Sequence, residues 1–411
     1  MTQENDTEKS ETGSPVFALF RTVLIIILVC YLLFIFAKSN PRVQAMLQKW
    51  SDAQNGAVNG ILSASGETMG TYWNVKISSP NKKWSEEKLA ETAQGIFDNV
   101  DRLMSTYRAD SEVSRFNATD STDWFDVSSE TAQTAELAKQ TAFVTDGALD
   151  ITIAPLVDFW KFGPDKTPLD TLPTDAEIEE CRAKTGIEKL DIRTDPPALK
   201  KAIAELAIDL SAVAKGFAVD MVAQRLTEEI EKKAIAGFMV DVGGEVRCGG
   251  HKGAQTPGTP QKGTIPWTMG IEKPIDAAPG AENLPQPALP QLARIVRVQD
   301  GAIATSGGAR NAFEIGGKRF SHIIDPATGK PTELVDGVRR VGSVSVFLAS
   351  CAEADAYATA LYVLGPEKGI PLADRLNLPV LYLMKDDEND SFTEIISSAF
   401  EKIDSEPVSG K

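Results

Sequence analysis

SVSVFLASCAEADAYATALYVLG, residues Ser343–Gly365, changes its hydrophobic period part-way along. Its first seven residues are mostly apolar or β-branched, which predicts a strand. Ser350 and Glu353 then have the spacing of a capping box, which predicts the start of a helix. Gly365-Pro366 predicts the end of that helix, because glycine commonly follows a helix and proline cannot continue it. This stretch therefore indicates a fold that mixes strands and helices.

Other segments repeat the mixture. Thr71–Ile77 alternates as a half-buried strand does. Apolar residues at helical spacing predict one helix over Glu86–Tyr107 and another from Val213 to Leu226. Further strands are expected at Ala207–Leu210, Phe238–Val242, Trp267–Pro274 and Ala293–Gln299. The fold class is therefore predicted to be α+β (mixed α/β), with a single large catalytic domain.

Composition excludes several classes of protein. Of the 411 residues, 42% are hydrophobic and 24% charged, which excludes wholesale disorder and collagen-like or coiled-coil chains. The net charge of −16 repels phosphate backbones and argues against nucleic-acid binding. With only two histidines, His251 and His322, a multi-histidine zinc or iron site is disfavoured, and a metal would need oxygen ligands. The four cysteines show no CxxC spacing, so we expect neither a disulfide framework nor a zinc knuckle.

Val16–Ala37 is an apolar run of about the length that spans a bilayer, and Arg21 can snorkel to the headgroups. A cleaved signal peptide is the alternative. The acidic residues before the run and the length of the run favour an uncleaved transmembrane helix. The lysine and arginine count on its two sides leans slightly toward a cytoplasmic C-terminal part.

The expected layout of the chain follows from these segments. It consists of an acidic tail (1–15), a transmembrane anchor (16–37), a linker or stalk (38–64), a catalytic domain (65–403) with Pro/Gly-rich loops at 252–266 and 275–290, and a loose tail (404–411).

The stretch Ala207–Gly216 is the first candidate for chemistry. A strand ending at Asp209 is followed by Ser211, which is expected to cap a helix. Free N–H groups at a helix N-terminus suit phosphate, and Lys215 would add positive charge. The alternative is an ordinary turn from a strand into a helix.

Asp355 and Thr359 form the second candidate. They are four residues apart, so they share one helix face, and the small residues Ala352 and Ala356 flank them. A carboxylate and a hydroxyl are hard oxygen ligands, which could hold Mg²⁺. The alternative is a polar stripe on the helix surface.

The third candidate is Ala304–Pro331. The glycine-rich turn Thr305–Gly308 would let backbone N–H groups approach a phosphate. His322 follows as a possible imidazole base, together with Asp325. The alternative is that His322 only makes hydrogen bonds at a partly buried strand end. The other glycine-rich turns, in Thr145–Leu156 and Val240–Gly250, fit neither a Rossmann fingerprint nor a Walker A loop.

In this order, nine stretches of the chain resemble the ApbE family, the FAD:protein FMN transferases. The resemblance covers roughly residues 65–385. The matching stretches are ETMGTYWNV (67–75), LMSTYRADSEVSRFN (103–117), DGALDITIAPLVDFWKFGP (146–164), IDLSAVAKGFAVD (208–220), DVGGEVRCGG (241–250), WTMGIEKP (267–274), ATSGG (304–308), RFSHIIDPATGKP (319–331) and CAEADAYATALYVLG (351–365). The chain departs from the family at Gly308 and Ala309, where members commonly carry Asp or Ser and then Tyr.

The resemblance implies a Mg²⁺-dependent transfer of the FMN moiety of FAD to a Thr hydroxyl of an acceptor flavoprotein, with release of AMP. It implies FAD contacts at Met69, Tyr107, Ala148, Leu149, Asp150, Asp209, Lys215 and Ile323, and magnesium ligands at Ala212 (its backbone carbonyl), Asp355 and Thr359. Asp355 would act through the metal, and His322 or a nearby carboxylate would take the Thr proton. A Mg²⁺-dependent FAD pyrophosphatase giving FMN and AMP, and a non-catalytic flavin-binding protein, stay open as alternatives.

The resemblance also bears on location. Relatives with export signals act outside the cytoplasmic membrane on flavoproteins of respiratory redox complexes. We therefore expect a single-pass protein of the inner (cytoplasmic) membrane whose catalytic domain faces the periplasmic, extracytoplasmic side, against the lysine and arginine count. Its expected partners are an acceptor flavoprotein of a membrane redox complex and the lipid bilayer.

Overall fold

The computed structural model describes residues 60–165, 167, 169, 171–254, 264–274, 291–308, 312–334, 340–386 and 391–408. The expected acidic tail, the transmembrane anchor (16–37), most of the stalk and most of both Pro/Gly-rich loops lie outside these residues. Within them, no helix combines the length and the apolar character needed to cross a bilayer.

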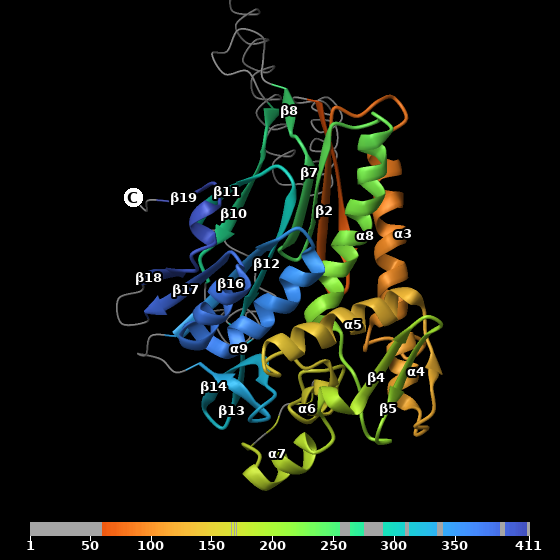
Figure 1. Ribbon diagram of the computed structural model, residues 1–411, viewed down its shortest axis with the longest axis vertical. Coiled ribbons are helices and arrows are strands. Elements are labelled where there is room, and N and C mark those ends of the chain that lie inside the picture. Colours follow the sequence, from red (N-terminus) through yellow and green to blue (C-terminus); the bar gives the residue numbers. More distant parts are fainter. Residues whose placement is uncertain are drawn as a thin grey trace, which may run out of the picture. The chain divides into compact units, whose positions relative to one another are not determined.

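An eight-stranded sheet, antiparallel between every pair of neighbours, lies at the centre of the catalytic unit (Figure 1). In sheet order its strands are β1 (Ile61–Thr68), β2 (Thr71–Ser78), β6 (Gly237–Val242), β7 (Glu245–Gly250), β12 (Gly301–Gly307), β16 (Arg340–Leu348), β17 (Val380–Asp386) and β18 (Ser391–Ile396). In β2 the alternating residues Trp73, Val75 and Ile77 are fully buried. The sequence alternation of this strand thus reflects its one core-facing side.

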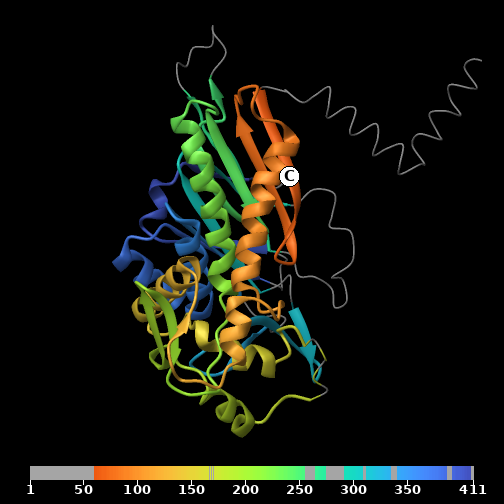
Figure 2. The ribbon, with the colours of Figure 1, turned by 90° about the vertical axis from the view of Figure 1, so that its right-hand side faces the viewer.

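Helices cover one face of this sheet. Figures 1 and 2 show α3 (Glu86–Met104) and α8 (Ser211–Glu231) side by side along it, with α5 (Ser129–Val144) nearby. The helix α9 (Cys351–Leu376) packs on β12, β16 and β17. It is interrupted at Gly365, whose φ of +66° is not helical, so the predicted helix stop is confirmed there.

A second sheet covers the other face. It consists of β10 (Trp267–Glu272), β11 (Leu292–Val298) and β19 (Ser405–Pro407). Trp267 of this sheet shares a buried cluster with Ile303, Phe347 and Leu381 of the large sheet. Consecutive residues of β16 (342–347) and of β17 (380–384) are buried, so these two strands face protein on both sides of the sheet.

Two smaller modules complete the unit. One combines β3 (Phe125–Asp126), β5 (Pro197–Lys201) and β4 (Leu190–Thr194) with α4 (Glu112–Ala118). In it the fully buried ammonium of Lys201 donates to the carbonyls of Ala204 and Leu206, at 3.0 and 3.1 Å. These bonds compensate for the burial of the charge.

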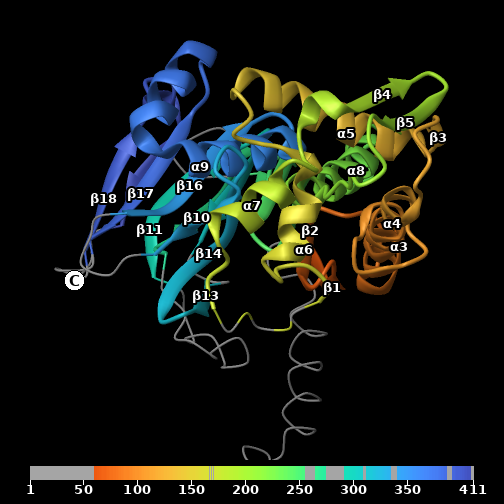
Figure 3. The same ribbon diagram turned by 90° about the horizontal axis from the view of Figure 1, so that it is seen from below.

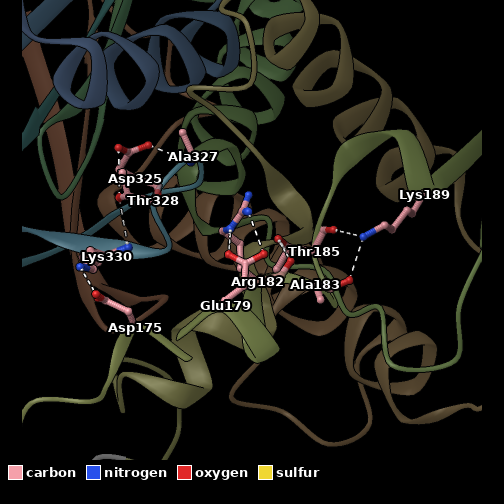
Figure 4. A network of polar contacts seen from close by, with 10 residues as sticks. All are labelled: Asp175, Glu179, Arg182, Ala183, Thr185, Lys189, Asp325, Ala327, Thr328 and Lys330. Atoms are coloured by element: carbon pink, nitrogen blue, oxygen red, sulfur yellow. Dashed lines mark hydrogen bonds and ion pairs between the residues drawn. The ribbon is translucent and has the colours of Figure 1, made fainter. Parts of the chain in front are cut away.

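The other module brings β13 (Ala312–Ile315), β14 (Lys318–Asp325) and β15 (Lys330–Glu333) beside α6 (Ala154–Phe159) and α7 (Asp175–Arg182), as Figure 3 shows. In Figure 4 the ammonium of Lys330 reaches Asp175 on α7, at 2.7 Å. Asp325 accepts from the N–H of Ala327 and the hydroxyl of Thr328. These bonds fix the β14–β15 turn.

The mixed α/β class is confirmed, with seven α-helices among the described residues. The predicted strand over Thr71–Ile77 is β2, and the predicted helix over Glu86–Tyr107 is α3, which ends at Met104. The predicted strand at Ala207–Leu210 is wrong. The side-chain amide of Asn117 bonds both the N–H and the C=O of Ile208, at 2.8 and 2.9 Å, where a neighbouring strand would otherwise do so.

Both expected ends of the catalytic domain need correction. The linker was expected to reach residue 64, but β1 begins at Ile61 and pairs with β2. The tail 404–411 was expected to be loose, yet Ser405–Pro407 is the strand β19 and pairs with β11. Sequence periodicity could not show β19, because it has three residues and its partner β11 lies far away along the chain.

Candidate active site

The candidate site is built where α8 and α9 cross. At Gly216, on the first turns of α8, a β-carbon would stand 2.4 Å from the carbonyl oxygen of Cys351. The two helix backbones therefore touch here, which only glycine allows. The N–H of Gly216 donates to Oδ2 of Asp355 on α9, at 3.1 Å. The crossing thus carries the candidate metal ligand to the start of α8.

Lys215 lies between two buried carboxylates. Its Nζ is 2.6 Å from Oε1 of Glu245 and 4.0 Å from Oδ1 of Asp355. Both acidic residues are only 3% exposed. Burial raises the pKa of Asp355 to about 7, although the Lys215 ammonium opposes this. Burial lowers the pKa of Lys215, but Asp355 and Glu245 outweigh it and keep the pKa above its ordinary value.

Thr359 lies one turn further along α9. Its Oγ1 is 3.1 Å from Oγ of Ser306. Ser306 lies in the strand β12 and pairs with β16, so the glycine-rich turn predicted at Thr305–Gly308 is wrong for Thr305, Ser306 and Gly307. The neighbouring Thr305 hydroxyl is 2.8 Å from that of Ser345 on β16. The structure thus brings the second and third sequence candidates together, with Ser306 orienting Thr359.

Asp220 fixes α9 relative to α8. Its carboxylate accepts from the hydroxyl of Ser350 at 2.7 Å and from the N–H groups of Cys351 and Ala352, at 2.9 and 3.1 Å. It also pairs with the Arg247 guanidinium. A carboxylate at a helix N-terminus satisfies free donors and interacts favourably with the helix dipole. Ser350 is the cap, as predicted, and its hydroxyl accepts from the N–H of Glu353.

β14 lies along α9 and carries His322 and Ile323. Ile323 is buried in one cluster with Ala358 and Tyr362 of α9. His322 is half-buried at an irregular point of the β14–β15 pairing. A β-carbon at Gly308 would lie 2.2 Å from the hydroxyl of Tyr362, so Tyr362 fills the space that larger residues need at this family position. Ala309, the second departure, lies outside the described residues.

A second group of predicted residues lies just before α8. The N–H of Asp209 donates to the carbonyl of Ile151, at 2.7 Å, so Asp209 lies beside the turn that contains Ala148, Leu149 and Asp150. Tyr107 is 60% exposed. Partial burial raises its pKa, and the charges of Asp209 and Asp158 raise it further.

Several of these residues also have clear structural roles. Oδ1 of Asp150 accepts from the N–H and the hydroxyl of Thr152, at 2.8 and 2.7 Å, and caps the short 3-10 helix η2 (Ile151–Ile153). Ala148 and Leu149 are buried in the main core. The predicted capping role of Ser211 is wrong. Ser211 is the first residue of α8, and its N–H donates to Asp209, at 2.7 Å.

Met69 occupies the turn between β1 and β2. Met69 and Gly70 have φ values of +49° and +70°, the signature of a type I′ hairpin turn. A methionine seldom adopts this conformation, and backbone strain of this kind clusters at functional sites. Its side chain packs against the main core.

Three residues of the candidate site were not predicted from the sequence: Glu245, Ser306 as a partner of Thr359, and Asp220. A signal for Glu245 existed. The Gly243-Gly244 turn, with φ values of +63° and +108°, makes a tight hairpin. That hairpin places Glu245 opposite the buried Val242, on the core side of the sheet.

The oxygen donors here fit magnesium. The described residues contain no group of three or more His, Cys, Asp or Glu side chains that could hold a metal. The ligands that the family resemblance implies, Asp355, Thr359 and the carbonyl of Ala212 in the first turn of α8, would instead offer one carboxylate, one hydroxyl and one carbonyl oxygen. Magnesium commonly takes one or two carboxylates and completes its shell with water and phosphate. A buried carboxyl whose pKa is raised to about 7 gains most from a nearby cation.

A family model described as the ApbE family matches residues 69–382. The chain belongs to the ApbE family. A Vibrio cholerae serotype O1 protein named FAD:protein FMN transferase is 41% identical over 336 residues, covering 82% of this chain and 90% of the relative. An Escherichia coli K12 protein of the same name is 36% identical over 337 residues, covering 82% and 87%.

Solved ApbE structures share the fold. The flavin transferase ApbE from Vibrio cholerae aligns with a TM-score of 0.67 and 38% identity, covering 84% of this chain and 99% of that one. The apo flavinyl transferase ApbE of Pseudomonas stutzeri aligns with a TM-score of 0.67 and 30% identity, covering 84% and 96%.

Gly216→Ala tests the close helix crossing. The added methyl group would press on the backbone of α9, so we expect a loss of about 1–3 kcal/mol in the free energy of unfolding. Gly95→Ala on α3 is the matched control, because a β-carbon at that exposed helical position meets nothing within 4 Å. It should stabilise by about 0.5–1 kcal/mol. Urea unfolding measures both, and equal shifts in the same direction would contradict the crossing geometry.

Two hollows open elsewhere on the described surface. One, of about 570 Å³, lies along α5 and α8. The other, of about 540 Å³, is lined by β1, β2 and β6 and includes Lys76 and Asp241. Neither is lined by Lys215, Asp355 or Thr359.

Asp241 makes stability depend on pH. Burial raises its pKa to about 6, although the N–H of Gly244 donates to it at 3.0 Å. The folded state therefore binds the proton more tightly than the unfolded state, and this stabilisation is lost as pH rises from about 4 to 6. The free energy of unfolding of Asp241→Asn should equal that of the wild type near pH 4 and exceed it by about 2 kcal/mol at pH 7.5. Urea unfolding at both pH values measures this, and a difference that does not grow with pH would contradict it.

Proposed function

We propose that this chain catalyses the Mg²⁺-dependent transfer of the FMN moiety of FAD to a Thr hydroxyl of an acceptor flavoprotein, releasing AMP. The chain is an enzyme of the FAD:protein FMN transferase class, like relatives 35–41% identical to it over most of its length. The observation that carries the chemistry is the arrangement of the half-buried Lys215 beside the buried Asp355, where α8 and α9 cross.

The residues of the site have distinct tasks in this reaction. The Lys215 ammonium, near the start of α8, would hold the FAD pyrophosphate. Asp355, Thr359 and the Ala212 carbonyl would hold magnesium, which when bound supplies Lewis-acid stabilisation of phosphate charge. The Thr oxygen bonds to the FMN phosphorus, and the P–O bond to AMP breaks. His322 would accept the Thr proton.

The remaining contacts would position FAD. We assign the flavin end to Met69 and Tyr107, and the rest of the cofactor to Ala148, Leu149, Asp150, Asp209 and Ile323. The exposed phenol of Tyr107 offers a flat surface on which an aromatic ring can stack. The hydrogen bond from Asp209 to Ile151, beside the Asp150 turn, and the effect of the Asp209 charge on the pKa of Tyr107 support a continuous binding surface.

A flavinylation assay tests the proposal. The purified full chain is incubated with FAD, Mg²⁺ and a flavoprotein domain that carries an Asp-x-x-Thr-x-Ala/Thr segment. Mass spectrometry should find FMN covalently attached to the Thr, and AMP should be released in equal amount. Free FMN and AMP without an adduct would show a pyrophosphatase instead, and unchanged FAD would show a flavin-binding protein. A Thr→Val acceptor is the matched control.

We further propose that residues 16–37 anchor the protein in the inner membrane, with the catalytic domain on the periplasmic side. The support is the length and apolar character of that run. Protease added to intact spheroplasts should digest the C-terminal part. A C-terminal part that is protected until the membrane is broken would overturn this orientation.

A further inference from the structure

Glu245 is a buried acid that the proposed reaction does not use. It is 3% exposed and lies at the first position of β7, directly after the Gly243-Gly244 turn. One of its oxygens is 2.6 Å from the Lys215 ammonium. The other, Oε2, is buried without a hydrogen-bond partner among the described residues. A buried carboxylate satisfied on one side only is costly to the fold, so its presence calls for a reason.

The position of Lys215 supplies that reason. Its Nζ contacts Glu245 but stays 4.0 Å from Asp355, beyond hydrogen-bond distance. Without the pull of Glu245, the ammonium would be drawn onto Asp355 and would compete there with any other cation. Two carboxylates around one ammonium also leave a net negative charge, which favours a divalent cation.

We propose that Glu245 is a positioning residue that holds the Lys215 ammonium away from Asp355, so that Asp355 is free to bind a divalent metal. Glu245 touches neither the metal nor FAD in this role. It acts through Lys215, and the tight glycine turn before it fixes where its carboxylate stands. The inference rests on the proposed function, because it assumes a metal at Asp355.

The test measures metal affinity separately from catalysis. FAD binding to the full chain in detergent micelles is followed by flavin fluorescence over a Mg²⁺ series, without acceptor. For Glu245→Gln we expect a rise of at least about tenfold in the Mg²⁺ concentration that produces half of the change in FAD binding, since charge pairs at such distances couple strongly. FAD binding without Mg²⁺ should change little, because Lys215 keeps its charge. Glu245→Asp should restore part of the metal affinity.

Glu353→Gln is the matched control. Glu353 is exposed on the same turn of α9, so its substitution removes one nearby negative charge without touching Lys215. A wild-type Mg²⁺ dependence of Glu245→Gln, an equal shift in Glu353→Gln, or an equal loss of FAD binding with and without Mg²⁺ would each overturn the inference. If Glu245→Gln does not fold, Glu245→Asp takes its place and should shift the Mg²⁺ dependence less, in the same direction. Failure of the proposed function would show separately, as a wild-type chain that forms no FMN adduct.

Discussion

Asp355→Ala is expected to abolish flavin transfer, with a loss of at least about a hundredfold in rate at saturating FAD and Mg²⁺. The alanine removes the one carboxylate among the proposed metal ligands. Lys215 alone would then face the pyrophosphate, and a single ammonium cannot stabilise the charge that develops on the leaving AMP as well as a metal can. The rate of formation of the covalent FMN–acceptor adduct, followed by mass spectrometry, is the measurement.

Stability separates this loss from misfolding. Burial raises the pKa of Asp355 to about 7, so its ionised form is costly above that pH and its removal relieves the fold of that cost. The variant loses one hydrogen bond, from the N–H of Gly216. We therefore expect thermal unfolding near pH 8 to be close to that of the wild type. Glu353→Ala, two residues earlier and exposed, should transfer FMN normally. Near-normal flavinylation by Asp355→Ala would show that Asp355 is not the metal ligand.

Local sequence patterns predicted those parts of the site that lie on one element. Asp355 and Thr359 share a face because both are on one capped helix, and cap and spacing are visible in the sequence. The helix that carries Lys215 was also predicted, although no side chain caps its start. The wrong prediction of Ser211 as a cap had a local cause, since Asp209 also has a short polar side chain and stands two residues earlier.

Contacts between elements far apart in the sequence could not be predicted from it. Glu245 meets Lys215 only because β7 pairs beside β6 underneath α8, and no periodicity reports that pairing. Ser306 and Asp220 likewise contact residues that are far away in the sequence, Thr359 and Ser350. The Asn117 side chain bonds the backbone of Ile208 in place of a neighbouring strand. The run Ala207–Leu210 is therefore not a strand, although its sequence resembles one. Pairing with β11 likewise orders the tail that composition predicted to be loose.

His322→Ala is expected to lower the transfer rate by about 10²–10⁴-fold while FAD binding is retained. An imidazole that takes the Thr proton acts only in the transition state, so its loss should change kcat and leave the flavin fluorescence titration unchanged. The other histidine gives the matched control: His251 lies after β7, and His251→Ala should retain the wild-type rate.

The competing base is Asp325, three residues along the same strand. Its carboxylate accepts from the N–H of Ala327 at 2.9 Å and from the hydroxyl of Thr328 at 3.2 Å, and these bonds fix the turn before Lys330. Because these bonds hold the turn in place, the carboxylate already has a structural task. We therefore expect Asp325→Asn to affect stability more than rate. A wild-type rate for His322→Ala together with a large rate loss for Asp325→Asn would transfer the role of base to Asp325.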